Sequence, residues 1–173
     1  MEKISDMNKA LGFSLVEMIV VLAVAAILAA LAVPSFERST SSSEVKKSAR
    51  DLVTTLNTAR AYAVNRRQNI VVVADGGDAG NEWGNPGWIL RLPAEVDGDQ
   101  RFDAPGDVTI DETRADISAF SLGPDGRVYD AAGANVIAQM EFAICPGNTS
   151  GVDGRTIQIN QFGKVRNINK EDC

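Results

Sequence analysis

The sequence predicts an α+β fold in which a long N-terminal helix is followed by a small β-domain. Three observations lead to this prediction. An apolar run covers residues 13–33, a helical stripe of apolar residues covers residues 44–67, and after Arg67 the apolar residues recur with the period of β-strands. With 173 residues, the chain has room for one compact core and one extended element.

The apolar run is the most distinctive segment of the chain. Only Glu17 interrupts it, and no residue from Met18 to Val33 is charged. As a helix, residues 13–33 would span roughly 31 Å, close to the hydrocarbon thickness of a bilayer. Because the run has no polar face, a membrane-spanning helix fits it better than a helix in a soluble core.

A secretory signal peptide is the alternative interpretation of this run. Cleavage after Ala32 would match the small-residue spacing that signal peptidase accepts. Against it, Glu17 places an acid near the start of the run, and residues 1–12 are not clearly basic. Translation from Met7 instead of Met1 would give a short, positively charged leader, and the sequence leaves both starts open.

A second helical pattern follows Pro34, a residue that lacks the amide donor and therefore kinks or breaks a helix. Residues 39–43 are polar and weakly helical, which predicts a flexible joint. From residue 44 to residue 67, the apolar residues form one narrow stripe opposite a basic face, so this helix needs a partner surface, most simply a sheet. The stripe consists of Val45, Ala49, Leu52, Leu56, Ala59 and Ala63.

Short apolar segments separated by turn residues predict the strands of the β-domain. Gly163 stands where the chain would turn between the last two strands. Trp83 and Trp88 are interpreted as anchors of the core or of loops. The predicted strands are Ile70–Ala74, Trp88–Leu92, Val108–Ile110, Ile117–Leu122, Val136–Ile144, Thr156–Gln161 and Val165–Ile168.

Composition and charge exclude several classes of function. The chain contains no histidine, which removes the His-dependent catalytic triads and the usual zinc ligand sets. A net charge of −6 offers no global basic surface for nucleic acid. The charges are segregated, since residues 37–67 hold seven basic residues against three acidic ones, whereas residues 75–130 hold thirteen acids against four arginines. We predict no enzyme, no metal site and no cofactor.

The N-terminal motif resembles that of the type IV pilin superfamily. The motif runs from Gly12 through Phe13 and Glu17 to the apolar run and its terminal Pro34. The resemblance implies that prepilin peptidase cuts after Gly12, that Phe13 becomes the N-methylated terminus, and that Pro34 kinks the helix. It also implies that Glu17 pairs with the N-terminal amine of a neighbouring subunit and sets the register of assembly, which would offset the cost of a carboxylate in the membrane.

The rest of the chain looks like the GspH/FimT family of minor pilins and pseudopilins. The similarity is carried by Thr58–Val73, Trp83, Gly87-Trp88, Phe142–Cys145 and Arg155–Arg166. It implies a type IV pilin-like fold, with the long helix packed on a small, mainly antiparallel β-domain. The resulting division is a leader peptide at 1–12, a transmembrane and assembly helix at 13–34, an amphipathic helix at 35–67 and the β-domain at 68–173.

This resemblance implies a low-copy structural subunit that primes or caps a type IV pilus. Its partners would be prepilin peptidase, other minor and major pilins or pseudopilins, and the inner membrane, with the head in the periplasm before assembly into a fibre, near the tip. The alternatives are an H-type minor pseudopilin of a type II secretion system, a DNA-binding minor pilin in DNA uptake, and the secreted soluble binding protein cut after Ala32.

Cys145 and Cys173 are the two cysteines of the chain. A bond between them would close a loop of about 29 residues and add on the order of 3 to 4 kcal/mol in the chain-entropy model. Two reduced thiols are the alternative, which an oxidising compartment disfavours. The resemblance tilts the choice towards a pilus, because some pilus-type minor pilins carry a terminal disulfide.

A local DNA-binding site is the less favoured hypothesis. Residues 163–166 occupy the place where a DNA-binding minor pilin of this family carries a Gly-Arg-x-Arg motif, but Lys164 replaces the first arginine and loses its bidentate fork. With Arg155 and Arg166 it would form a small basic patch. The acidic loops oppose the approach of DNA, so assembly is favoured over DNA uptake.

Overall fold

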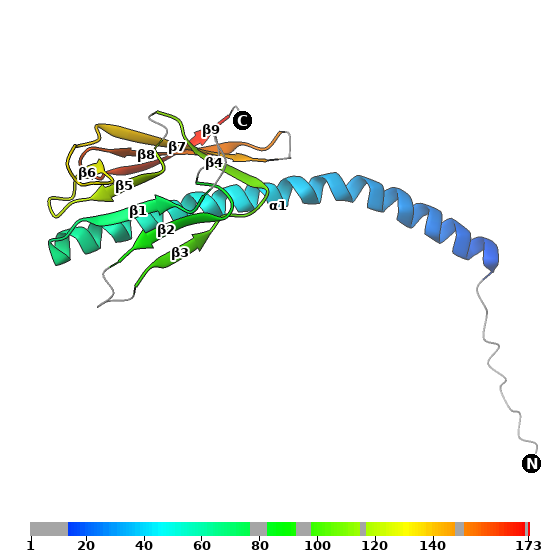
Figure 1. The fold of residues 1–173 in the computed structure, drawn as a ribbon. Helices are drawn as coiled ribbons and strands as arrows, with labels where there is room; N and C mark the ends of the chain where they lie inside the picture. The colour runs from blue at the N-terminus through cyan, green and yellow to red at the C-terminus, as the bar shows by residue number, and fades with distance from the viewer. Residues whose placement is uncertain (1–13, 77–82, 93–97, 115–116, 148–150, 172) are drawn as a thin grey trace, which may run out of the picture. The chain divides into compact units, whose positions relative to one another are not determined.

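The computed structural model describes residues 14–76, 83–92, 98–114, 117–147, 151–171 and 173. The chain divides into two compact units, Met1–Phe36 and Glu37–Cys173. Helix α1 (Leu15–Arg66) contributes to both units, and all strands of the described residues belong to the second (Figure 1). We call the second unit, residues 37–173, the head.

Helix α1 differs from the prediction at residues 39–43, where it continues without the expected joint. The Ser43 hydroxyl donates to the backbone carbonyl of Ser39 at 2.8 Å, so it is satisfied within the helix. Ser41 is buried in the head. Packing of this turn therefore overrides the weak helix propensity of serine.

The predicted apolar stripe of α1 is confirmed as the face that the head buries. Its six residues, from Val45 to Ala63, are at most 1% exposed. The helix ends where Arg67 adopts a positive φ of 55°. There the Gln68 amide donates to the Ala63 carbonyl at 3.2 Å, which satisfies an otherwise unpaired carbonyl of the last turn.

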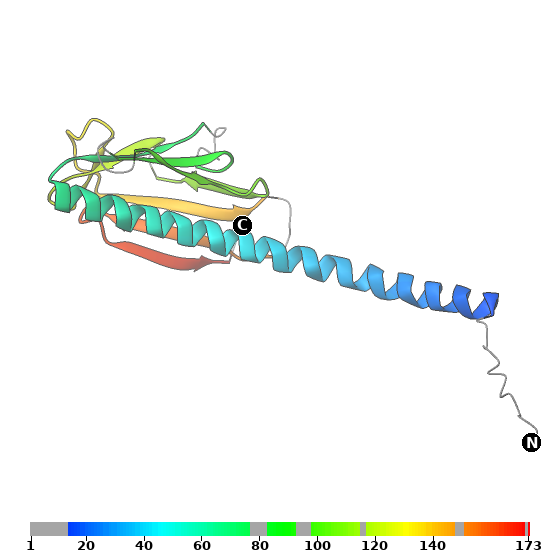
Figure 2. The same ribbon diagram turned by 90° about the horizontal axis from the view of Figure 1, so that it is seen from below.

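Two antiparallel sheets complete the head and lie beside the second half of α1 (Figures 1 and 2). The five-stranded sheet has the order β3-β2-β1-β5-β6, and the four-stranded sheet has the order β4-β7-β8-β9. The α+β, mainly antiparallel architecture is thus as predicted. The strands are β1 (Ile70–Ala74), β2 (Gly87–Arg91), β3 (Gln100–Asp103), β4 (Val108–Glu112), β5 (Ala119–Leu122), β6 (Val128–Asp130), β7 (Gln139–Pro146), β8 (Gly154–Asn160) and β9 (Val165–Lys170).

The predicted strands agree with the observed ones in place, and β1 agrees at both ends. The strand predicted from Val136 instead begins at Gln139. Two short strands, β3 and β6, were not predicted. In β3 only Phe102 is apolar, and Arg101 and Asp103 are exposed, so an edge strand of this kind has no apolar run to reveal it.

Trp83 joins the two sheets from the connection between β1 and β2. Its ring centroid lies 5.6 Å from that of Phe120 on β5 and 5.1 Å from that of Phe142 on β7. Its indole N–H donates to the Ile117 carbonyl at 2.8 Å. Because β5 and β7 belong to different sheets, this fully buried side chain is a shared element of both.

Trp88 connects α1 to the five-stranded sheet. Its indole N–H donates to the Thr55 hydroxyl of α1 at 2.9 Å, and its ring stacks on Phe102 of β3 at 5.9 Å. The polar edge of the buried indole is therefore satisfied while its face excludes water. Both tryptophans are core anchors, as the sequence interpretation held.

Glu112 is a buried acid that organises the end of β4. Its side chain is 2% exposed, and Oε1 accepts the backbone N–H groups of Arg114 and Glu141 at 3.3 and 3.1 Å. Oε2 accepts the Ile117 N–H at 3.4 Å. A carboxylate with several amide donors tolerates burial, so Glu112 fastens β7 and the approach to β5 onto β4.

Candidate assembly surface

The first unit presents a continuous apolar surface. Large side chains from Leu15 to Phe36 are exposed on α1, with Leu15 and Phe36 each 74% exposed. Within the described residues this segment is apolar and long enough to cross a membrane, and none of its apolar window is buried in the molecule. A surface of this size needs a cover, which a bilayer or neighbouring apolar helices provide.

Glu17 lies in the first turn of α1 and is exposed. It is the one charged residue between Ser14 and Phe36. The positive end of the helix dipole favours a carboxylate at this position, although hydrocarbon around it would not. Gly12 and Phe13, the residues of the expected cut and methylation, lie outside the described residues.

Helix α1 also includes Pro34. Proline at this position offers no N–H to the carbonyl of Ala30, one turn earlier. The predicted kink at Pro34 stays a prediction.

Cys145 and Cys173 form a disulfide with their Cα atoms 5.6 Å apart. Cys145 lies near the end of β7, where it pairs with Thr109 of β4. The bond therefore fastens the last residue of the chain to the middle of the four-stranded sheet, through the strand next to β8.

Gly154→Ala is expected to weaken this disulfide. A Cβ at residue 154 would meet the Cys173 sulfur, the Ile144 carbonyl oxygen at 2.6 Å and the Cys145 sulfur at 3.4 Å. The sulfur is pushed away unless β8 moves, so we expect a free-thiol fraction at least about tenfold above wild type. Thiol alkylation and mass spectrometry of the purified full chain measure that fraction. Gly151→Ala is the control, since nothing lies within 4 Å of its Cβ position; equal thiol content in all three proteins contradicts the prediction.

The structure separates the three basic residues of the candidate DNA site. Lys164 and Arg166 line one small pocket of about 150 Å³ beside Gln158. Arg155 pairs in register with Asn169, whereas Gln158 pairs with Arg166. Because side chains alternate between the faces of a strand, Arg155 lies on the opposite face of β8 from Gln158 and Arg166. The expectation of one patch that includes Arg155 is therefore wrong.

A cluster that sequence reasoning missed surrounds the turn between β8 and β9. Gly163, which has a φ of +70°, lies against the Gly126 carbonyl, and a Cβ there would come within 3.0 Å of the Arg60 side chain. The Arg127 guanidinium lies 5.6 Å from the centre of the exposed Phe162 ring. The Gly-Pro-Asp-Gly turn at 123–126 marked this loop in the sequence, but not its contact with α1.

Two carboxylates near this turn have perturbed acidity. The Tyr129 hydroxyl donates to Asp125 at 2.7 Å, which lowers the pKa of Asp125 and raises the pKa of Tyr129. Backbone donation from Ala134 and the Asn135 side chain lowers the pKa of Asp130. Both acids hold turns, and the described residues contain no group of three His, Cys, Asp or Glu residues arranged to hold a metal ion.

A helix with a long exposed apolar segment, continued by a second half that packs on antiparallel sheets, defines a pilin-like subunit, anchored by its apolar segment and assembled through it. The family model described as type II transport protein GspH matches residues 48–163, and that of the prokaryotic N-terminal methylation motif matches residues 7–33. The chain belongs to the GspH family of the pilin and pseudopilin superfamily. This family comprises structural subunits rather than enzymes.

Solved structures share the fold. Two crystal structures of the type IV minor pilin FimU from Pseudomonas aeruginosa strain PAO1 superimpose with a TM-score of 0.52, at 23% and 22% sequence identity. They cover 71% and 72% of this chain, and 91% and 87% of FimU. The minor pseudopilin EpsH from the type 2 secretion system of Vibrio cholerae has a TM-score of 0.49 and 15% identity, over 72% of this chain and 96% of EpsH. None of the curated proteins compared with the chain matches it.

Proposed function

We propose that this protein is a minor pilin, a low-copy structural subunit that primes or caps a type IV pilus near its tip. The observation that carries the proposal is the union, in one chain, of an N-terminal methylation motif with an exposed apolar helix and a GspH-family head. In this proposal, residues 1–12 are the leader, 13–34 anchor and assemble the subunit, 35–67 form the spine and 68–173 form the β-domain.

The disulfide favours the pilus. It fastens the C-terminus in the head, which suits a subunit exposed outside the inner membrane in an oxidising compartment. A minor pseudopilin of a type II secretion system is the second candidate, and the description of the matching family as a type II transport protein favours it. DNA binding is a lesser candidate, because the structure leaves only Lys164 and Arg166 together.

Masses of the protein purified from the membrane of its native host test the processing step. We expect a chain that begins at N-methylated Phe13 and that gains two hydrogens on reduction, because the Cys145–Cys173 bond opens. Gly12→Val is the matched change, since a bulky residue at the cut blocks the extended backbone that the peptidase needs. We expect that variant to keep residues 1–12. A soluble chain that begins at Val33 would overturn the pilin proposal in favour of a secreted protein.

Deletion of the gene in the native host separates the two fibre systems. Loss of surface pili with normal protein secretion supports the pilus, whereas loss of secretion with normal pili supports the pseudopilus. Complementation with the wild-type chain is the control.

A further inference from the structure

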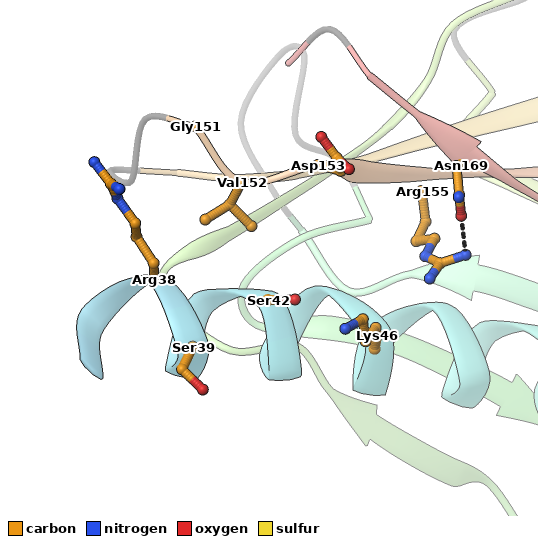
Figure 3. A pocket seen from close by; sticks show the side chains of 9 residues that line it. All are labelled: Arg38, Ser39, Ser42, Lys46, Gly151, Val152, Asp153, Arg155 and Asn169. Atoms are coloured by element: carbon orange, nitrogen blue, oxygen red, sulfur yellow. Dashed lines mark hydrogen bonds between the residues drawn. The ribbon is translucent and has the colours of Figure 1, made fainter. Parts of the chain in front are cut away.

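A polar pocket of about 390 Å³ lies in the head between α1 and the strands β8 and β9 (Figure 3). Arg155 and Asn169 project from these strands towards the turns of α1 that carry Ser42 and Lys46. The lining comprises Arg38, Ser39, Ser42, Lys46, Gly151, Val152, Asp153, Arg155 and Asn169. The pocket thus draws its residues from a helix, a loop and two strands.

The pocket is electropositive within an acidic protein. Arg38, Lys46 and Arg155 supply three cations against the single carboxylate of Asp153. Among the described residues, none of the ion pairs involves these three cations. Arg155 is held in place by the Asn169 side chain, to which its guanidinium donates. The pocket is therefore charged and in part preorganised, but its charge is not neutralised by the head that forms it.

We propose that this pocket binds a carboxylate-bearing segment of a neighbouring fibre subunit, an inference that rests on the proposed function. Arginine, lysine, serine and asparagine together supply the donors that carboxylates accept. A volume of about 390 Å³ exceeds what one small anion needs and holds acidic side chains from a short loop. The pocket begins at Arg38, two residues beyond the apolar segment that ends at Phe36, where neighbouring subunits of a fibre lie close.

Nucleic acid fits this pocket less well. A duplex presents its phosphates on a broad convex surface, which contacts a groove or a flat patch rather than entering a recess of this size. A net charge of −6 also opposes the approach of a polyanion, whereas a short acidic loop held by fibre packing arrives without long-range steering.

Binding of a fluorescein-labelled hexaglutamate peptide to the full chain in non-ionic detergent tests the proposal. Fluorescence anisotropy should show that the triple variant R38Q/K46Q/R155Q binds roughly tenfold more weakly, because three partly exposed ion pairs are lost. Asp153→Asn should bind about two- to threefold more tightly, since it removes the one repulsive carboxylate. Both differences should shrink at high salt.

The matched control is R66Q/R91Q/R114Q, which removes three exposed arginines from elsewhere in the head. This control should change the affinity less than twofold. Equal losses in the two triple variants would reduce the effect to net charge and overturn the proposal. Tighter binding of a 20-base-pair duplex that is lost in R38Q/K46Q/R155Q would also overturn it, in favour of nucleic acid. Normal cleavage after Gly12 in a chain that fails to bind the peptide would sink this inference alone and leave the pilin proposal standing.

Discussion

Glu17→Ala is expected to lower the fraction of the protein found in fibres by more than about tenfold, with the head still folded. A carboxylate at the start of an apolar segment costs about 2.5 to 3.5 kcal/mol in hydrocarbon, and pairing with the N-terminal amine of a neighbour offsets this cost in register. Alanine fits the membrane better but removes the pairing partner. The head is unaffected because Glu17 belongs to the other compact unit.

Immunoblots of sheared fibres and of membranes from the native host measure this fraction. Glu37→Ala is the matched control, because it removes an acid from α1 just beyond the apolar segment. This control should incorporate normally. Normal incorporation of Glu17→Ala would contradict the register model, and a drop in its total membrane level would indicate a defect before assembly instead.

Trp83→Ala is expected to lower the free energy of unfolding of the head by about 3 to 5 kcal/mol. The substitution removes a fully buried ring that contacts Phe120 and Phe142, and it strips the Ile117 carbonyl of its donor. Since typical domains are stable by only about 5 to 15 kcal/mol, the loss is a large fraction of the total. Urea unfolding of the full chain in detergent, followed by circular dichroism, measures it.

Two variants separate the causes of this loss. Trp83→Phe keeps most of the aromatic packing and removes the indole N–H, so it should cost less than alanine does. Phe162→Ala removes a half-exposed ring from the turn between β8 and β9, and should change stability far less. A cost below about 1 kcal/mol for Trp83→Ala would show that Trp83 does not join the two sheets energetically.

Periodicity explains why the elements were predictable. The buried stripe of α1 and the strand β1 repeat their apolar residues with the period of one helix face or of a central strand, and burial of that face follows directly. The short edge strand β3 has no such pattern, and the serines at 39–43 favour turns locally, so both needed the surrounding packing to reveal their state. Glu112 was not found either, because its donors come from backbone amides that carry no sequence signal.

The order of residues along the chain was enough to determine the α+β class, the apolar segment with Glu17 at its start, the spine of the head and the family motif, since each depends on local spacing alone. Folding decided which distant residues meet. Arg155 is eleven residues from Arg166 in sequence, yet the pairing of β8 with β9 places them on opposite faces and turns Arg155 towards Lys46 instead. Strand register and helix packing set such contacts, and they depend on the whole core rather than on any one segment.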